Sequence, residues 1–395
     1  MDFLSFIIWS TDPDMFTFPE WVPWIAGRPV RWYGLLFALG FLISQQIMFY
    51  IYRKEGKPEK DVETLTVFMV IATILGARLG HVFFYEPDKY LANPIDIIKI
   101  WEGGLASHGA AFGILFALWL YTRYEITTKW LLVIPTGFKV KRITRPNQNW
   151  LQVVDRIVIV VALTGCLIRT GNFMNSEIYG IPTQSDYGVV FARNLESPPF
   201  LTDSSPIEKI EAIKDDKRAL EDGKVPILIN IQFKNQPEVL NKESLDRYIK
   251  GRLAGLLHSG RYYVNDHITA PESPTYKLDQ NQDGSFSASV EAYGIARYPT
   301  QLYEALTSLL IFVLLFILWW RLKIKTPDGL LLGLFLILLF GLRFVHELFK
   351  ENQVAFEDGL SYNMGQLLSI PLILAGIYIF FRALTINKKT QQQFD

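Results

Sequence analysis

Residues 300–320 read TQLYEALTSLLIFVLLFILWW, and residues 329–349 read GLLLGLFLILLFGLRFVHELF. Each stretch is predominantly apolar and about 20 residues long, which is the length of a helix that crosses a hydrocarbon core of roughly 30 Å. This length favours a spanning helix over the core helix of a soluble protein. With five similar windows, the sequence predicts seven spanning helices, at 32–52, 62–85, 104–122, 151–171, 300–320, 329–349 and 363–383. We therefore expect an all-α polytopic membrane protein.

The bulk composition narrows the possible partners and cofactors only a little. The chain has 395 residues, of which 50% are hydrophobic, and its 39 Lys and Arg balance its 39 Asp and Glu. This balance gives no indication of a nucleic-acid partner, and we expect none. The single cysteine, Cys166, excludes an internal disulfide and a cysteine metal cluster. A His-Glu-x-x-His motif is also absent from the sequence, so we expect no metal.

The basic residues of the short loops predict the orientation in the membrane, because cytoplasmic loops are enriched in Lys and Arg. The loops after the first, third and fifth windows and the C-terminal tail are basic, whereas the other short loops hold only Lys89, Lys99 and Lys350. All the basic loops then lie on one side of the membrane. We expect the N-terminus outside and the C-terminus inside, which agrees with an odd number of spans.

Changes in composition divide the chain into four regions. Residues 1–30 are rich in Trp, Phe and Pro, which suits an interfacial segment on the outer face. Residues 31–180 hold the first four spans, and residues 298–395 hold the last three and a cytoplasmic tail. Residues 181–297 are polar and are expected to form a small extracytoplasmic α/β head.

Within this head, the sequence pattern predicts two helices and three strands. The helices are expected at 206–222 and 244–257, and the strands at 225–233, 261–268 and 285–293. The stretch DQNQDG at 279–284 matches the first half of a calcium-binding loop, but Val290 stands where the pattern requires Glu. We expect a plain turn there, for which Asp-Gly is a common signal.

Polar and charged side chains occur inside or at the ends of the apolar windows. At a rise of about 1.5 Å per residue, nearly all of them lie at the level of the outer leaflet. They are Tyr33, Arg78, Ser107, His108, Arg169, Asn172, Asn175, Glu177, Gln301, Glu304, Arg343, Glu347 and Gln366. Because a charge inside a membrane is costly, a whole layer of such groups indicates a site.

Each of these residues also has a structural interpretation. Arg78 can reach a lipid phosphate at the interface without taking part in chemistry. Arg343 and Glu347 are four residues apart and can form a structural ion pair on one helical face, and His108 can be a buried, hydrogen-bonded histidine. Their common depth favours the functional interpretation.

The residue types in this layer suggest an anionic phospholipid as the ligand. Arginine binds phosphate bidentately and stays charged when buried. A histidine or a carboxylate can accept a proton near neutral pH. The residues alone therefore indicate an enzyme or a transporter that acts on an anionic lipid from the outer leaflet.

Several short strings closely resemble the prolipoprotein diacylglyceryl transferase family. The most specific are GGLASHG at 103–109, RTGNFMNSE at 169–177 and YPTQLYE at 298–304. Further matches occur in the same order as in the family, and they are RWYG at 31–34, GARLG at 76–80, RFVHE at 343–347 and MGQ at 364–366.

The resemblance implies a reaction and a location. The diacylglyceryl group of phosphatidylglycerol would pass to the thiol of the lipobox cysteine in a bacterial prolipoprotein, and glycerol phosphate would be released. It also implies that no metal or organic cofactor is needed. The protein would lie among membrane lipids in the bacterial cytoplasmic (inner) membrane, with its active site facing the outer leaflet.

The resemblance and the demands of this reaction suggest a role for each residue. Among the catalytic residues, Arg169 would bind the phosphate, Arg343 would stabilise phosphate charge, and His108 would accept the thiol proton. Among the substrate-binding residues, Tyr33 and Asn172 would orient the headgroup, and Asn175 and Glu177 would hold the Arg169 segment. The other substrate-binding residues would be Arg78, Gly180, Gln301, Glu304, Glu347 and Gln366. The chain departs from the family at Tyr298, where histidine is frequent, and in its longer head.

Two other classes of protein are alternatives. A transporter or flippase of an anionic phospholipid would use the same arginines to guide the headgroup, but it should also offer polar groups along a path to the inner side. The inner halves of the windows hold mainly Gln45, Gln46, Asp155 and Arg156. A structural or receptor membrane protein with a functional head would leave the polar layer unexplained.

Overall fold

A computed structural model describes residues 5–23, 26–100, 103–131, 134–197, 200–236, 240–258, 266–351, 359 and 362–392, with the backbone alone for 127–138 and 386–392 within these ranges. The chain folds into two compact units. The helical unit comprises residues 37–167, 306–344 and 364–395, and the head unit comprises residues 1–36, 168–305 and 345–363. Each unit has its own hydrophobic core.

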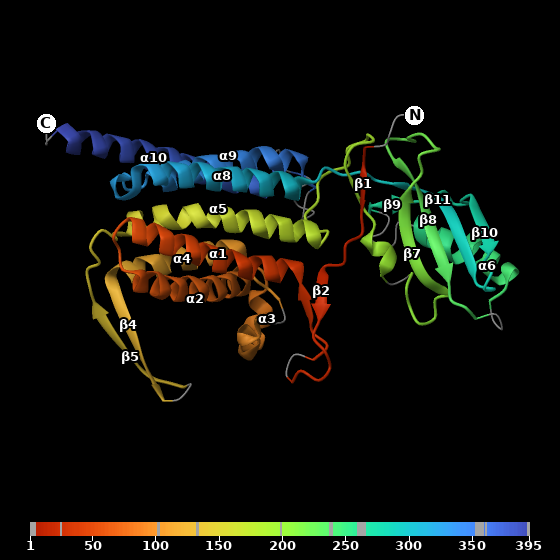
Figure 1. Cartoon of the computed structure of the whole chain (residues 1–395), viewed down its shortest axis with the longest axis horizontal. Coiled ribbons are helices and arrows are strands. Elements are labelled where there is room, and N and C mark those ends of the chain that lie inside the picture. The colour runs from red at the N-terminus through yellow and green to blue at the C-terminus, as the bar shows by residue number, and fades with distance from the viewer. Residues whose placement is uncertain are drawn as a thin grey trace. The chain divides into compact units, whose positions relative to one another are not determined.

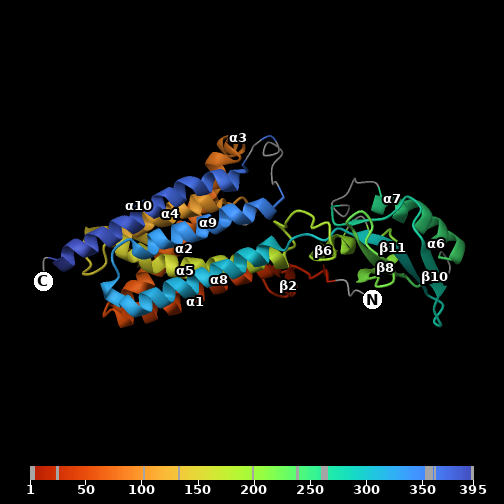
Figure 2. The same cartoon turned by 90° about the horizontal axis from the view of Figure 1, so that it is seen from above.

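The apolar windows of the sequence form long helices. In the described part of the chain, these are α1 (Trp32–Lys54), α2 (Glu59–Phe84), α4 (Ser107–Arg123), α5 (Trp150–Met174), α8 (Thr300–Leu322), α9 (Leu330–His346) and α10 (Met364–Gln392). They run side by side in the helical unit (Figures 1 and 2). Six helices are long and apolar enough to cross a membrane, as in a multi-pass membrane protein. Helix α4 has only 17 residues, or about 25 Å, so the count of seven spans stays a prediction.

Helices α2 and α4 approach each other closely because both carry glycine at their contact. A Cβ added at Gly80 would lie 2.7 Å from the Cα of Gly109, and one added at Gly76 would lie 2.5 Å from the Gly109 carbonyl oxygen. Small residues allow such close packing between membrane helices. This contact holds the start of α4, which carries His108.

Buried charges near the start of α5 are paired within the helical unit. Glu55 Oε1 accepts hydrogen bonds from Arg156 Nη2 and Trp319 Nε1, both at 2.8 Å. Asp155 accepts hydrogen bonds from two backbone N–H groups at the start of α9, also at 2.8 Å, where the helix dipole favours a carboxylate. Asp155 and Arg156 are both 0% exposed, so these two charges have a structural role in tying α5 to α8 and α9.

Shorter elements connect the long helices. Between α2 and α4 lie α3 (Pro87–Ala92) and η1 (Pro94–Ile98), and η6 (Lys323–Lys325) follows α8. The basic loop after α4 contains an antiparallel hairpin, β4 (Tyr124–Leu131) with β5 (Ile134–Arg142). The sequence analysis treated this stretch only as a loop.

The head unit contains a sheet with the strand order β10-β11-β8-β7, and β9 pairs with β11. The strands are β7 (Ile207–Lys214), β8 (Val225–Phe233), β9 (Ile268–Thr269), β10 (Tyr276–Gln280) and β11 (Phe286–Gly294). A helical segment consists of α6 (Lys242–Tyr248), the π-helical η4 (Ile249–Leu253) and α7 (Ala254–His258). Its Leu257 is fully buried in one core with Ile227 and Ile229 of β8.

Most of the elements predicted for the head are confirmed. Strands occur at 225–233 and 286–294, a helical segment covers 244–257, and a turn at 281–284 separates β10 from β11. Of the strand predicted at 261–268, residues 261–265 lie outside the described residues, and the described end belongs to β9 at Ile268.

The helix predicted at 206–222 is wrong, because this stretch holds strand β7. Its isoleucines, Ile207, Ile210 and Ile213, are three residues apart, which resembles the period of a helix. In the structure, the register of β7 against β8 shifts between Ile207 and Lys209. A bulge of this kind adds one residue, so Ile207 and Ile210 can both face the core, where they are buried.

The N-terminal region contributes further strands to the head unit. Strand β1 (Ile7–Trp9) runs parallel to β6 (Val189–Phe191), and β2 (Asp14–Thr17) forms a hairpin with β3 (Pro29–Arg31). Two 3-10 turns, η3 (Arg193–Glu196) and η7 (Glu347–Phe349), complete the unit.

Candidate functional site

The candidate site begins at the last turn of α5, which carries Arg169 and Asn172. The chain then turns sharply, and two non-glycine residues, Ser176 (φ +52°) and Ile178 (φ +56°), have a left-handed backbone. This conformation is strained for most residues, and especially for a β-branched one. Such strain persists only where the surroundings hold the backbone, and it is common at functional sites.

Glu177 lies between the two strained residues and holds the turn together. Its Oε1 accepts hydrogen bonds from Asn172 Nδ2 at 2.8 Å and from Asn175 Nδ2 at 3.3 Å. Its backbone N–H donates to the Asn172 carbonyl, and its own carbonyl accepts a 2.8 Å bond from Gln301 Nε2. Glu177 thus joins the end of α5 to the start of α8, whereas the substrate-binding role predicted for Glu177 and Asn175 stays a prediction.

A buried ion-pair network links this turn to α8 and η7. Glu304 Oε2 lies 2.5 Å from Arg169 Nε, and Glu304 Oε1 lies 2.5 Å from Lys350 Nζ. Lys350 Nζ also lies 3.0 Å from Glu347 Oε1. The side chains of Lys350 and Glu304 are only 3% and 8% exposed, and that of Arg169 is 23% exposed. Arg169 and Lys350 are thus held close together by Glu304, and Glu347 provides a second carboxylate beside Lys350.

Lys350 is the residue of this network that the sequence analysis missed. It was counted as an isolated loop charge, although its spacing of three residues from Glu347 allows the two side chains to pair. Arg297 was also missed, and it is 4% exposed. Arg297 Nη1 donates to the Gly180 carbonyl at 3.1 Å and to Glu351 Oε2 at 3.0 Å, so it supports the chain beyond the turn.

Gly180 is placed where a side chain has no room. A Cβ there would lie 2.5 Å from the carbonyl oxygen of Tyr298 and 2.7 Å from that of Phe349. The Gly180 N–H donates to the Tyr298 carbonyl at 3.1 Å. The geometry therefore favours a positioning role for Gly180, between the start of α8 and η7.

Tyr33 packs against the same end of α5. A Cβ added at Gly171 would lie 3.0 Å from the Cα of Tyr33. Tyr33 and Asn175 line one open pocket of about 480 Å³, together with Gly34 and residues 29–31. Two residues predicted to bind substrate therefore share a cavity.

Three buried polar atoms near the turn have no hydrogen-bond partner among the described residues. They are Asn175 Oδ1, Ser176 Oγ and Gln301 Oε1. Buried polar atoms are nearly always satisfied by protein, water or a ligand. The turn beside Glu177 thus holds polar atoms whose hydrogen-bonding capacity the described residues do not use.

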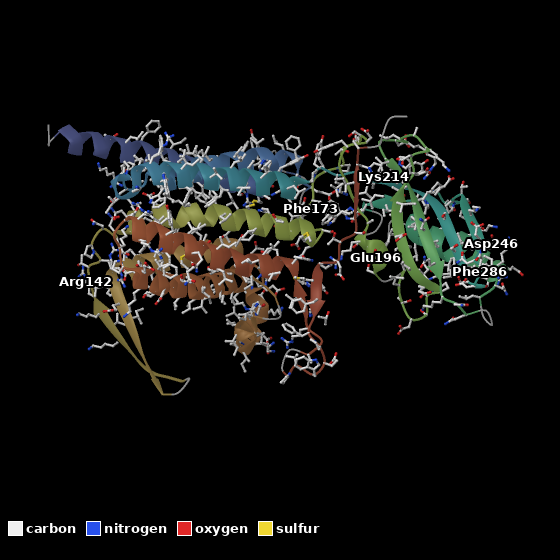
Figure 3. All side chains as sticks on the ribbon, in the orientation of Figure 1. Arg142, Phe173, Glu196, Lys214, Asp246 and Phe286 are labelled. Atoms are coloured by element: carbon white, nitrogen blue, oxygen red, sulfur yellow. The ribbon has the colours of Figure 1, made fainter. Side chains whose placement is uncertain are left out.

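Aromatic side chains pack around Phe173, just before the turn. Phe173, labelled in Figure 3 at the end of α5, lies 4.4 Å from Trp9 of β1 and 6.0 Å from Phe191 of β6 between ring centroids. Pairs of this kind add to the stability that burial provides. The parallel strands β1 and β6 thus support the segment that carries Arg169.

The other predicted residues belong to the helical unit. Arg78 is 3% exposed and donates hydrogen bonds to five backbone carbonyls of residues 96–104, at 2.5 to 3.2 Å. Its guanidinium therefore binds the chain that leads into α4, which favours a role in positioning this segment. Gln366 Nε2 donates to the Phe344 carbonyl at 3.3 Å, and Arg343 lies in the last turn of α9.

His108, the second residue of α4, lies beside aromatic rings. Its ring centroid is 5.4 Å from that of Phe84 and 5.7 Å from that of Tyr85. Because His108 and Arg343 belong to one unit and Arg169 to the other, their convergence on a common pocket stays a prediction. The pairing of Arg343 with Glu347 stays a prediction for the same reason. Within the described residues, no group of His, Cys, Asp and Glu side chains is arranged to hold a metal ion.

The chain is similar over nearly its whole length to proteins of one family. A family model described as prolipoprotein diacylglyceryl transferase matches residues 22–382. The chain is 34% identical over 373 residues to the phosphatidylglycerol–prolipoprotein diacylglyceryl transferase of Tolumonas auensis, with 94% of this chain and 96% of the relative covered. The relative of the same name from Porphyromonas gingivalis is 33% identical, with 98% of each chain covered. The relative from Chloroherpeton thalassium is 31% identical, with 97% of this chain and 96% of the relative covered. The chain therefore belongs to the prolipoprotein diacylglyceryl transferase family.

Proposed function

We propose that this protein transfers the diacylglyceryl group of phosphatidylglycerol to the thiol of the lipobox cysteine of a prolipoprotein. A bond forms between the cysteine sulfur and the glyceryl carbon that carries the phosphate, and the bond from that carbon to the phosphate oxygen breaks. Glycerol phosphate leaves with the electron pair, and the thiol gives up its proton. The transferase activity is that of the family to which the chain belongs.

The ion-pair network around Glu304 is the observation that carries this proposal. The leaving group is an anion, so the site must stabilise negative charge in a place from which water is largely excluded. The Arg169 side chain is 23% exposed although it is paired with Glu304, so its guanidinium can also donate to a phosphate oxygen. Lys350 adds a second positive charge, which is bound to the other oxygen of Glu304.

Other residues divide the remaining tasks. Asn172 and Tyr33 orient the headgroup, and Asn175, which lines one pocket with Tyr33, hydrogen-bonds to its glycerol hydroxyls. His108 accepts the thiol proton, directly or through water, because an imidazole can take up a proton near neutral pH. Arg343 stabilises the phosphate together with Arg169.

The proposed reaction fits a particular placement in the membrane. All seven long helices, α4 included, span the bacterial inner membrane, with the N-terminus outside and the C-terminus inside. The basic loops support this orientation, and the lead-in at 103–106 lengthens the path of α4 across the bilayer. Residues 181–297 then form the extracytoplasmic head, and the site faces the outer leaflet, where the lipobox of an exported prolipoprotein is accessible.

The transporter alternative lacks support in the inner halves of the helices. A path for a lipid headgroup needs polar groups that can exchange partners with it. Asp155 and Arg156, the two inner charges, are fully buried and bound to the start of α9 and to Glu55. Releasing either one would leave an uncompensated buried charge.

A direct assay tests the proposed function. The purified protein is incubated with phosphatidylglycerol and a peptide that carries a lipobox cysteine, and the peptide is analysed by mass spectrometry. We expect an adduct with the mass of a diacylglyceryl group, and no adduct when the cysteine is replaced by serine. Arg169→Ala should lower the rate by about 10²–10³ through loss of a preorganised donor. A folded wild-type protein that yields no adduct would overturn the proposal.

A further inference from the structure

The hairpin of β4 and β5 is a feature that the transferase reaction does not require. Its base is fixed in the helical unit, because Ile143 N–H donates to the Arg123 carbonyl at 2.9 Å and Tyr124 lies 6.1 Å from Trp119 between ring centroids. Beyond the base, the two strands pair with each other and with no other strand in the described part of the chain. A two-stranded hairpin alone is at best marginally stable in water, so this one needs a surface on which to lie.

The register of the two strands separates apolar from basic residues. Ile126 pairs with Val140, and on the same face the next pair towards the base is Tyr124 with Arg142. On the opposite face, Glu125 pairs with Lys141, and Lys139 lies two residues before Lys141 on β5. Side chains directly opposite each other in an antiparallel pair lie on one face, and the faces alternate along the strand. The hairpin is therefore amphipathic.

The apolar face is open in the structure. Ile126 is 38% exposed, and Val140 is 60% exposed. Lys139, Lys141 and Arg142 are also exposed. A soluble protein seldom leaves such an apolar strip uncovered beside concentrated positive charge, and the combination is typical of segments that lie in a membrane interface.

The direction of the hairpin agrees with a position along the bilayer. Figure 1 shows β4 and β5 leaving the end of the helices and running across the helix axes instead of continuing along them. Arg142, labelled in Figure 3, marks its base beside the ends of α4 and α5. If the helices cross a membrane, a segment that runs across their ends lies along its surface.

We propose that β4 and β5 lie on an anionic lipid leaflet, with Ile126 and Val140 in contact with the acyl boundary. The positive charges of Arg123, Lys139 and Lys141 outnumber the negative charge of Glu125, which complements anionic headgroups. The ribbon is thin, so the lysines of its far face still lie within the Debye length of about 8 Å from those headgroups. A lipid surface is favoured over a protein partner because β4 follows α4 directly and residues 143–149 join β5 to α5, so both ends of the hairpin are tied to long apolar helices of the helical unit.

A fluorescent label on each face of the hairpin tests this proposal in the full-length protein. Cys166→Ala provides a background without other cysteines, into which Val140→Cys or the matched control Lys141→Cys is introduced and labelled with an environment-sensitive dye. The protein is placed in lipid nanodiscs of phosphatidylcholine alone or with phosphatidylserine, which keeps the anionic charge separate from the proposed substrate. Spin-labelled lipid then serves as a quencher, and thermal melting checks that each variant is folded.

The two positions should respond differently. We expect the dye at 140 to be blue-shifted and quenched several-fold more than the dye at 141, with the difference largest in anionic discs. Adding Lys139→Glu to Val140→Cys should reduce quenching in anionic discs to the level of neutral discs. Equal quenching at both positions, or equal quenching in neutral and anionic discs, would overturn the proposal. A blue shift at 140 without lipid quenching would also overturn it, because it would indicate contact with protein.

Discussion

Glu304 places its Oε2 2.5 Å from the Nε of Arg169, so that one buried carboxylate holds the arginine at the end of α5. Its other oxygen is bound to Lys350. The two cations would repel each other without this carboxylate between them. Glu304 thus allows two positive charges to remain close together in a place with little water, which is a condition for binding a phosphate there.

Glu304→Gln should therefore damage both activity and stability. The amide keeps the shape of the side chain but leaves Arg169 without its carboxylate and Lys350 with Glu347 as its remaining carboxylate. Breaking a fully buried pair costs about 3–5 kcal/mol, and the cost is smaller here because Arg169 is partly exposed and Lys350 keeps Glu347. We expect the transfer rate to fall by at least about 10² and the melting temperature to drop. Glu86→Gln, at an exposed ion pair with Lys89, is the control and should change neither measurement appreciably.

Lys350 should matter through its charge. Lys350→Met removes the charge and keeps most of the side-chain volume, whereas Lys350→Arg keeps the charge. If the lysine supports phosphate binding, the Met variant should lose about 10² in rate, as expected for a charged donor, and the Arg variant should recover part of it. Rates measured at several phosphatidylglycerol concentrations show whether the loss is in binding of this lipid. Similar rates in the two variants would show that Lys350 serves only to fill space.

Gly180→Ala should disrupt the packing between the start of α8 and η7. The added Cβ would meet two backbone oxygens at 2.5 and 2.7 Å, and backbone atoms cannot move aside as a side chain can. We expect a loss of stability of about 1–3 kcal/mol, typical of overpacking, measured as a lower melting temperature. Gly255→Ala in α7 has nothing within 4 Å of the new Cβ and should be neutral or slightly stabilising. A Gly180 variant as stable as the Gly255 variant would contradict the close packing.

The long helices could be predicted because lipid imposes a simple rule on the sequence. A run of apolar residues long enough to cross the bilayer must form its hydrogen bonds internally, which leaves the helix as the available structure. The predicted windows at 62–85 and 300–320 accordingly differ from α2 and α8 by a few residues at their ends.

Outside the membrane, the same reasoning is weaker. The isoleucines of β7 follow the period of a helix, and only the bulge beside Ile207 reconciles them with a strand. The β4–β5 hairpin was overlooked because its lysines were counted only as markers of orientation. In both stretches, tertiary pairing decides the structure, and pairing partners are not visible in a local pattern.

Nine of the residues predicted for the site belong to the head unit, and their roles stay predictions. Depth and motif pointed to Arg169 and Glu177, because polar groups within apolar windows are conspicuous. Lys350 was missed, since a lysine just beyond an apolar window resembles an ordinary loop charge. Its burial depends on how η7 packs against α8, which the sequence does not reveal.

His108→Gln tests the base proposed for the thiol proton. Glutamine keeps a hydrogen-bonding side chain but cannot titrate, so we expect the transfer rate to fall by about 10²–10⁴. His81→Gln is a matched control, because His81 stacks on the same Tyr85 ring, and it should keep the wild-type rate. An unchanged rate in the His108 variant would exclude an essential base at this position.

His267 provides a pH-dependent contribution to the stability of the head unit. It is 3% exposed and packs edge-on against Tyr179, with ring centroids 4.6 Å apart. Burial, together with the nearby positive charge of Arg297, lowers the pKa of His267 to about 3. The imidazole is therefore neutral in the folded protein at any pH at which the protein is normally studied.

Stability should decrease as the pH falls below about 6.5, the pKa of an unperturbed histidine. Between this value and about 3, the unfolded chain binds a proton at His267 that the folded chain does not, so the free energy of unfolding falls by up to about 1.4 kcal/mol per pH unit. Above pH 6.5 the residue adds no pH dependence. His267→Phe should make the melting temperature depend less on pH between pH 4.5 and 7 than it does in the wild type. His258→Gln, at an exposed histidine, should leave this pH dependence unchanged. Parallel curves for the wild type and the His267 variant would show that this histidine is not held neutral by the fold.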